Sequence, residues 1–214
     1  MNSEIISNET VEVTNQSLEN YRNIQPEKEI STSEVNNYWE SEFRNASETY
    51  NKELRQKEYY DDNGTLYRVG DCLLPDTEYE VNGYKYNTDE KGRIVSAEGT
   101  LRMRDSEYDR EMEDVKRIDG QNYKQGDDRG HLIGHQFGGS DRLENLVPMD
   151  AKLNHWDFYK VEKTLAEAVK DNADVKLKVE PFYNDNSTRP SEFKVSYSID
   201  GDRETVVFRN ERED

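Results

Sequence analysis

The dipeptide Asn82-Gly83 is the local feature that most constrains how this chain can fold. Polar and apolar residues alternate through Thr77–Val81 before it and again through Tyr84–Tyr86 after it. Alternation on both sides of Asn-Gly is the strongest short-range signal for a β-hairpin, because both central residues of a type I′ turn need a positive φ. The sequence therefore predicts two antiparallel strands joined at this turn.

The same alternation predicts further strands on both sides of the chain's centre. Before the centre, a turn at Asp61–Gly64 is followed by a predicted meander over Leu66–Met103, with a turn at Asp89–Gly92 and strands at Arg93–Ala97 and Thr100–Met103. After the centre it predicts strands at Val175–Val179, Phe193–Ile199 and Thr205–Phe208. Apolar residues at helical spacing predict one helix from His155 to about Asp171. The predicted class is α+β, an antiparallel sheet with the central stretch and a flanking helix laid across it.

The first part of the chain differs in composition. Residues 1 to about 35 are rich in Asn, Ser, Thr and Glu without a sustained hydrophobic period, so we expect a disordered segment or a linker. Apolar and aromatic residues then recur mostly every three or four positions from Ser33 to about Tyr60, which predicts a helix. Because only 32% of the residues are hydrophobic and 36% are charged, we divide the chain into an extension at 1–60 and a folded domain at 61–214.

The charge and the single cysteine exclude several classes of protein. A formal net charge of −18 argues against recruitment of nucleic acid by bulk attraction, although a local basic patch remains compatible with it. Cys72 can form neither an intramolecular disulfide nor a thiolate cluster, and beside Leu73 and Leu74 it is expected to be buried. Residues 1–10 lack the pattern of a Sec signal peptide, and no apolar run approaches the roughly 20 residues that cross a bilayer. We therefore expect a soluble protein without a membrane span.

The centre of the chain, from Asp127 to Glu162, gathers the residue types that hydrolysis of a phosphodiester requires. That reaction needs a base for water and positive charge near the leaving and non-bridging oxygens. His131 suits the base, because the pKa of an unperturbed histidine lies near neutrality. Arg129 offers a planar fork for phosphate. Asn154 offers a neutral oxygen that can bind Mg²⁺.

Spacing adds a carboxylate to this set. Glu162 follows Asn154 by about two helical turns, so we expect it on the same side of the predicted helix, where it could hold the metal's waters. Gly130 and Gly134 flank His131 and would let the backbone approach a ligand closely. Each residue also has an ordinary structural role, such as a helix cap or a solvated side chain, and only their combination favours catalysis.

The other two histidines have weaker indications. His135 follows His131 at the spacing of a zinc pair on a helix, but no third ligand stands nearby and the flanking glycines disfavour a helix, so we discount zinc. His155 adjoins Asn154 and would point about 100° away from it on a helix. Its role is either structural or substrate-facing.

Taken together, these residues resemble a known family. Asp128–His131, followed by Asn145–Met149, Asn154 and Glu162, resembles the motif of the DNA/RNA non-specific endonucleases, whose active site is a ββα-metal motif. The resemblance covers roughly Cys72–Asn210. Within the family, the chain looks like the nuclease domains at the C-termini of bacterial polymorphic and contact-dependent toxins.

The resemblance implies a role for each motif residue. His131 would be the general base, Asn154 the one direct protein ligand of Mg²⁺, with Mn²⁺ as the alternative ion, and Glu162 would orient the metal's waters. Arg129 would engage the phosphate or support the site. Two more residues would support it, Asp128 and Asn145, and Asn145 would do so by holding the motif's loop with hydrogen bonds. A further arginine often helps in this family, and the candidates are Arg102, Arg104 and Arg110.

The implied activity is Mg²⁺-dependent hydrolysis of DNA and RNA to 5′-phosphorylated products. The implied context is an antibacterial toxin that leaves by a non-Sec route or is delivered to target cells, and that an immunity protein neutralises. A scavenging or competence nuclease could carry the same site. The alternative from another class is a catalytically weak binding or interaction module with this fold, which the net charge of −18 motivates.

Overall fold

The computed structural model describes residues 44, 57–105, 112–117 and 120–211 of the chain. The chain divides into two units, residues 1–51 and 52–214. Every described residue except Arg44 belongs to the second unit. Arg44 is helical and exposed. The predicted disorder of residues 1 to about 35 and most of the predicted helix from Ser33 lie outside the described residues.

The predicted end of that helix is wrong. Strand β1 (Glu58–Tyr60) pairs antiparallel with β2 (Leu66–Val69), because Asp61–Gly64 turns the chain back as predicted. The side chain of Asp61 fixes this turn by accepting hydrogen bonds from the amides of Asn63 and Thr65 at 2.9 and 2.7 Å. Strand β2 also pairs with β3 (Cys72–Leu73), so these segments form a small three-stranded sheet.

Cys72 is exposed, which corrects the prediction that it is buried. Its neighbour Leu73 is half-buried. The two residues belong to one short strand, where consecutive side chains point to opposite faces, so a run of apolar letters does not bury every member.

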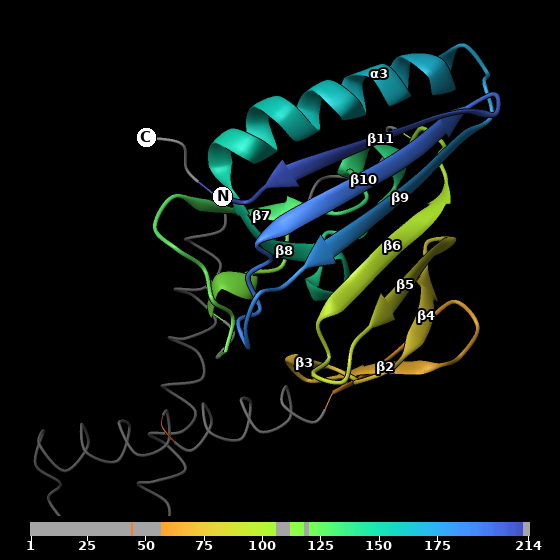
Figure 1. Cartoon of the computed structure of the whole chain (residues 1–214). Coiled ribbons are helices and arrows are strands. Elements are labelled where there is room, and N and C mark those ends of the chain that lie inside the picture. The colour runs from red at the N-terminus through yellow and green to blue at the C-terminus, as the bar shows by residue number, and fades with distance from the viewer. Residues whose placement is uncertain (1–43, 45–56, 106–111, 118–119, 212–214) are drawn as a thin grey trace, which may run out of the picture. The chain divides into compact units, whose positions relative to one another are not determined.

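The main sheet has six strands in the order β11-β10-β9-β6-β5-β4, and all neighbours are antiparallel (Figure 1). The strands are β4 (Glu78–Val81), β5 (Tyr84–Thr88), β6 (Ile94–Thr100), β9 (Val175–Phe182), β10 (Glu192–Ile199) and β11 (Asp202–Arg209). This arrangement confirms the predicted hairpin, the three later strands and the α+β class. Asn82 and Gly83 have φ values of 55° and 74°, as a type I′ turn requires.

The predicted strand Thr100–Met103 is wrong beyond its first residue. Strand β6 ends at Thr100, and the chain then leaves the sheet. The amide of Arg104 donates a hydrogen bond to the carbonyl of Gln136 at 2.8 Å. This segment therefore bonds to the loop after β7 (Asp127–His131) and not to a neighbouring strand of the sheet.

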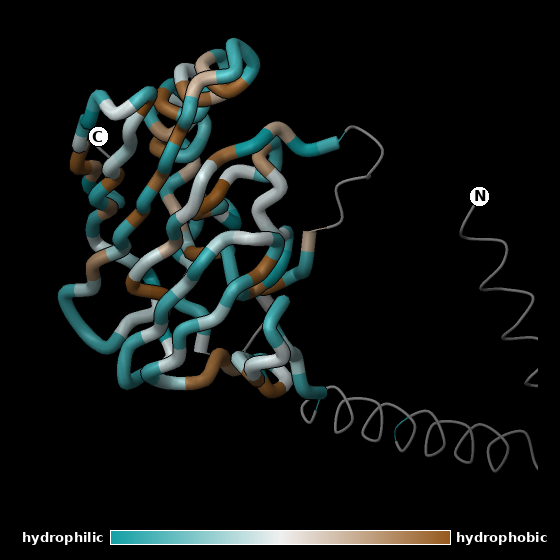
Figure 2. The backbone as a smooth tube through the Cα atoms, turned by 90° about the vertical axis from the view of Figure 1, so that its right-hand side faces the viewer, coloured by the Kyte–Doolittle hydropathy of each residue, from teal (hydrophilic) through white to brown (hydrophobic). Residues whose placement is uncertain are grey.

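One face of the main sheet forms the core. The strand registers align a row of side chains that are each at most 2% exposed: Val195, Val179, Ala97, Tyr86 and Tyr79. Ion pairs cover the other face, with Lys178 beside Glu98 and Glu180 at 3.6 and 3.7 Å. Figure 2 shows the resulting interleaving of hydrophobic and hydrophilic residues along the strands. Such alternation is what a sheet with one solvated face requires.

The predicted helix is confirmed, and it begins with a wider turn. A π-helical segment, η4 (Leu153–Phe158), continues directly into α3 (Tyr159–Lys170), which lies alongside β9–β11 (Figure 1). The ring of Phe158 packs at 5.4 Å from the rings of Phe193 and Phe208, on β10 and β11. These contacts fix the start of the helix against the sheet.

A two-stranded ribbon precedes the helix. Strand β7 (Asp127–His131) pairs antiparallel with β8 (Leu146–Asp150), and η4 with α3 follows. This order confirms the predicted ββα arrangement. Within the described residues, no helix is long and apolar enough to cross a membrane.

Candidate active site

Glycine at position 130 lets the two strands of the ribbon pack closely. A Cβ built on Gly130 would lie 2.5 Å from the Cβ of Met149 on β8, a distance that side chains do not tolerate. The expectation that Gly130 lets the backbone approach a ligand is therefore wrong, since its free face is filled by β8. The start of β7 is held by Arg189, which binds both carboxylate oxygens of Asp127 at 2.7 and 2.8 Å.

Asn145 holds the loop that joins the two strands. Its side chain is fully buried, accepts a hydrogen bond from the amide of Ile133 at 2.9 Å and donates to the carbonyls of Ile133 and Ser140 at 2.8 Å. These three bonds tie both ends of the loop to one side chain, the role expected for Asn145. Within the loop, a Cβ on Gly139 would lie 1.9 Å from the carbonyl oxygen of Ile133, so this turn requires glycine.

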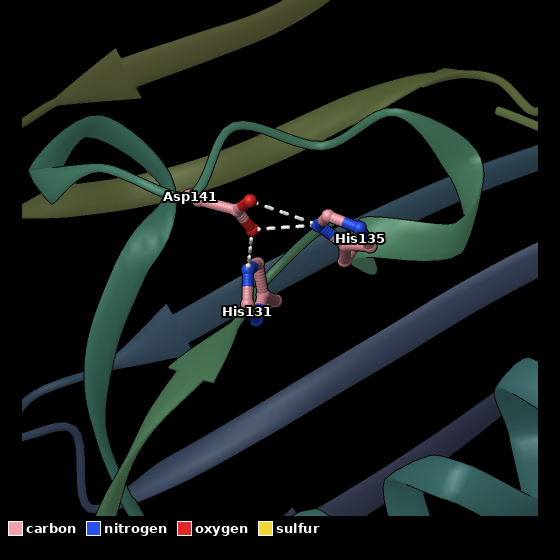
Figure 3. A group of neighbouring side chains, drawn as sticks. All are labelled: His131, His135 and Asp141. Carbon is pink, nitrogen blue, oxygen red and sulfur yellow. Dashed lines mark hydrogen bonds and ion pairs between the residues drawn. The ribbon is translucent and has the colours of Figure 1, made fainter. Parts of the chain in front are cut away.

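The loop brings His131, His135 and Asp141 together (Figure 3). Nε2 of His131 lies 2.8 Å from Oδ1 of Asp141, and Nδ1 of His135 lies 2.8 Å from the same oxygen. The loop therefore supplies a third potential ligand to the pair of histidines, which corrects the expectation that none stands nearby. His135 lies in a short 3-10 turn (His135–Phe137) and not on an α-helix, as the flanking glycines predicted.

Asp141 accepts a hydrogen bond from His131. Burial raises the pKa of Asp141, but the hydrogen bonds from His131 and His135 outweigh it and lower this pKa to about 2. The carboxylate is therefore ionised at neutral pH and can only accept. Nε2 of His131 is therefore the donor in this hydrogen bond, which orients the imidazole ring.

A second group lies around the first turn of the helix. Asp128, Arg129, Asn154 and His155 line an open hollow of about 490 Å³ together with Met112 and Lys116. Nδ2 of Asn154 and Nε2 of His155 lie 3.2 and 2.8 Å from the same carboxylate oxygen of Asp128. The expectation that His155 points away from Asn154 is thus wrong, since both side chains reach one carboxylate. Both belong to the wide π-helical turn rather than to a regular α-helix.

Glu162 lies against the segment that follows His131. A Cβ on Gly134 would lie 2.4 Å from Oε1 of Glu162, and Nε2 of Gln136 lies 3.3 Å from Oε2. Gly134 therefore makes room for a side chain of the protein, which corrects the expectation that it makes room for a ligand. Asn154 thus contacts β7 at Asp128, and Glu162 contacts the loop at Gln136.

The candidate arginines differ in position. Nη1 of Arg104 lies 3.1 Å from Nδ1 of His135 and 3.9 Å from Oδ2 of Asp141. Arg102 instead donates to the carbonyl of Asn82 at 2.6 Å, at the hairpin turn. Arg110 lies outside the described residues.

Glu113 is an organising residue that the sequence did not reveal. Its carboxylate accepts two hydrogen bonds from Arg68, at 2.7 and 2.8 Å, and one from the amide of Leu143 at 2.8 Å. Its backbone amide donates to the carbonyl of Asp141, and its carbonyl accepts from Arg129 at 3.0 Å. One residue thus connects the small sheet, the loop and β7. No local signal marks this role, because Arg68 is 45 positions away.

The ribbon, the loop and the helix form a ββα unit, with the candidate catalytic side chains on β7, in the loop and at the helix start. Residues 75–201 match the family described as DNA/RNA non-specific endonuclease, and the chain belongs to that family. The match covers more than half of the chain, so it extends over most of the described domain. The match begins after β3, so the small sheet lies outside it.

Known proteins also resemble this chain. The type VII secretion system protein EssD of Staphylococcus aureus (strain USA300) is 37% identical over 141 residues, which are 61% of this chain and 22% of EssD. The chain thus spans about a fifth of the length of this relative. Magnesium-bound NucA from Streptococcus agalactiae aligns with a TM-score of 0.48 and 18% identity, over 73% of this chain and 83% of NucA. The zinc-bound Sda1 nuclease aligns with a TM-score of 0.49 and 19% identity, over 59% and 75%.

Proposed function

We propose that this domain hydrolyses phosphodiester bonds of DNA and RNA with a divalent cation and with His131 as the general base. The single observation that carries the proposal is the setting of His131 within a chain of this family. The imidazole lies at the end of β7, 7% exposed, with one nitrogen held by an ionised carboxylate. That arrangement orients the imidazole, a group suited to accept a proton from water.

The residues of the hollow fit a magnesium ion. Mg²⁺ prefers hard oxygen ligands and keeps several waters. The amide of Asn154 and the carboxylate of Asp128 border an open hollow, and Asn154 contacts Asp128 through its nitrogen, not its oxygen. We propose Asn154 as the direct ligand and Asp128 as its support, with Mn²⁺ as the alternative ion. When bound, the cation would supply positive charge for the phosphate and the leaving oxygen.

Other side chains would bind and orient the substrate. Arg129 lines the hollow beside Asn154 and is held by the carbonyl of Glu113, so its fork is positioned for a phosphate oxygen. Glu162 would orient metal-bound waters from the loop side, where it lies against Gly134. Among the arginines predicted as helpers, Arg104 is the one beside the histidine cluster, and we propose it over Arg102.

The biological context is a separate proposal. EssD is named as a type VII secretion system protein, and similarity to it supports non-Sec secretion of this chain. We propose that the domain is the toxic part of a secreted effector and that an immunity protein binds it. Because the chain spans 22% of EssD, this proposal concerns the nuclease domain and not the activity of the whole relative.

The test is digestion of plasmid DNA and of total RNA by the full chain with Mg²⁺, with EDTA, and by His131→Ala and Asn154→Ala. We expect cleavage that needs the metal and His131, and a raised requirement for Mg²⁺ in Asn154→Ala. Cleavage that survives His131→Ala would refute the proposed base. Binding of nucleic acid without cleavage by any of these proteins, across metals and salt concentrations, would instead favour the interaction module that the net charge of −18 motivates.

A further inference from the structure

We infer that His131, His135 and Asp141 form a binding site for a transition-metal ion such as Zn²⁺, separate from the proposed Mg²⁺ site, and that its occupancy switches the endonuclease off. The binding half of this inference depends only on the three side chains. The inhibition half rests on the function proposed above for His131. The two halves are therefore tested by different measurements.

The geometry of the three side chains is close to that of a metal site. One ligand atom from each residue lies within 4.8 Å of the others, and one oxygen of Asp141 lies 2.8 Å from a nitrogen of each ring. Ligand atoms around a tetrahedral zinc ion lie about 3.4 Å apart, given metal–ligand bonds of about 2.0–2.1 Å. Small side-chain rotations would therefore admit the ion. Figure 3 shows both rings directed toward the carboxylate from different segments of the chain.

The ligand types select the ion. Imidazole nitrogen suits Zn²⁺, Cu²⁺ and Ni²⁺, whereas Mg²⁺ prefers an all-oxygen environment. The hollow around Asn154 and Asp128 offers oxygens, and the cluster around Asp141 offers two imidazoles and one carboxylate. The two places thus discriminate between hard and borderline cations. Three protein ligands would leave a fourth position of the ion for water.

Protons connect occupancy to activity. In the metal-free protein, Nε2 of His131 donates its hydrogen to the carboxylate of Asp141 at 2.8 Å. A metal ion bound to Nε2 needs the lone pair of that nitrogen, so the ring proton moves to Nδ1 through solvent. The metal-bound ring would then carry its proton on Nδ1, the nitrogen that a general base at this position would otherwise use. A bound ion would therefore block the general base without changing the fold.

Neighbouring groups tune the affinity. The guanidinium of Arg104 lies 3.1 Å from Nδ1 of His135 and 3.9 Å from Asp141, and its positive charge opposes a cation there. The charge of Asp141 favours the ion. Access is through His135, whose side chain is 25% exposed, because those of His131 and Asp141 are each 8% exposed. Replacement of Arg104 by a neutral residue should therefore tighten binding.

Metal binding is measured by isothermal titration calorimetry with Zn²⁺ alone and by visible absorption with Co²⁺. The chain has three histidines, so His135→Ala and His155→Ala are matched single removals. We expect one Zn²⁺ per chain, at least tenfold weaker binding in His135→Ala, unchanged binding in His155→Ala, and tighter binding in Arg104→Gln. Equal affinity in the wild type and His135→Ala, or loss of binding in His155→Ala, would overturn the site.

Inhibition is measured on the same proteins as Mg²⁺-dependent plasmid cleavage over a range of Zn²⁺ concentrations. We expect Zn²⁺ to inhibit the wild type at its binding midpoint and to inhibit His135→Ala only at tenfold higher concentrations or above. Zinc binding that leaves cleavage unchanged would overturn the switch. If no condition gives cleavage, the proposed function fails, and the calorimetry still decides whether the site exists.

Discussion

Replacement of Arg68 by methionine should destabilise the nuclease domain more than any surface substitution. The Arg68 side chain is 1% exposed, and it binds the carboxylate of Glu113 through two hydrogen bonds and the carbonyl of Gly70 through a third, at 2.6 Å. It also lies 3.6 Å from the carboxylate of Glu144, which is 2% exposed. Methionine keeps most of the apolar stem but leaves two carboxylates without their cation.

The magnitude follows from the charges left behind. Removal of one partner from a buried ion pair costs about 3–5 kcal/mol, because the remaining charge stays desolvated. The lost hydrogen bond to the carbonyl of Gly70 adds about 1 kcal/mol, which the added apolar burial of methionine partly offsets. We expect a net loss of about 3–5 kcal/mol in the free energy of unfolding at pH 7.

The loss should also depend on pH. Burial raises the pKa of Glu113, but the hydrogen bonds and charge of Arg68 outweigh it and lower this pKa below its usual value. Because the folded-state pKa is lowered, the stabilisation by this pair is present above the unfolded pKa and is lost as the pH falls through the folded one. The difference between wild type and Arg68→Met should therefore be largest near neutrality and shrink below about pH 4.5, the usual value for a glutamate.

Equilibrium unfolding in urea, followed by far-ultraviolet circular dichroism at pH 7 and pH 4, measures both effects. Lys178→Met is the matched control, because Lys178 is 41% exposed and pairs with Glu98 and Glu180 on the solvated face. We expect a change below about 1 kcal/mol there. A loss below about 1 kcal/mol in Arg68→Met, or a loss of equal size at both pH values, would refute the reasoning.

Three further predictions concern the same region. Burial raises the pKa of Glu144, so Glu144→Gln should leave the free energy of unfolding at pH 7 unchanged or raise it by about 1 kcal/mol. The gain should vanish at lower pH, where the wild-type residue is protonated, and urea unfolding at several pH values checks this. Gly134→Ala should keep the fold but displace the carboxylate of Glu162, so plasmid cleavage should fall as far as in Glu162→Ala; full activity would contradict the role of Glu162. Gly139→Ala should cost at least about 2 kcal/mol in thermal unfolding, because its Cβ would meet the backbone oxygen of Ile133 instead of a mobile side chain.

Local patterns were sufficient for the parts of the fold that depend on local geometry. The hairpin at Asn82-Gly83, the later strands and the helix after the ribbon follow from alternation, turn chemistry and helical spacing, and all of them occur. The errors fall where a neighbour decides the outcome. Thr100–Met103 alternates like a strand, but the amide of Arg104 bonds to Gln136, so the chain leaves the sheet. The predicted helix reaches about Tyr60, but the turn after that residue pairs β1 with β2.

The candidate site shows the same division. The motif indicated His131, Asn145 and Asn154 by residue type and order, because these residues lie in one short stretch of sequence. It could not indicate Glu113, whose contacts to Arg68 and Arg129 join segments that are distant in the chain. Contacts of this kind depend on how the sheets pack, which no periodicity encodes.

Asp141 links the two roles proposed for this cluster. A carboxylate that orients the ring of His131 must lie within hydrogen-bond distance of Nε2, and at 2.8 Å it also lies where a second ligand of a metal ion would be. A carboxylate beside a single imidazole therefore indicates a general base and gives no indication of a metal site. Addition of His135 to the same oxygen makes the arrangement a potential metal site, because it supplies the third ligand atom. Sensitivity to Zn²⁺ should therefore depend on His135, whereas the proposed base depends on His131 and Asp141, and substitution of His135 should separate inhibition from catalysis.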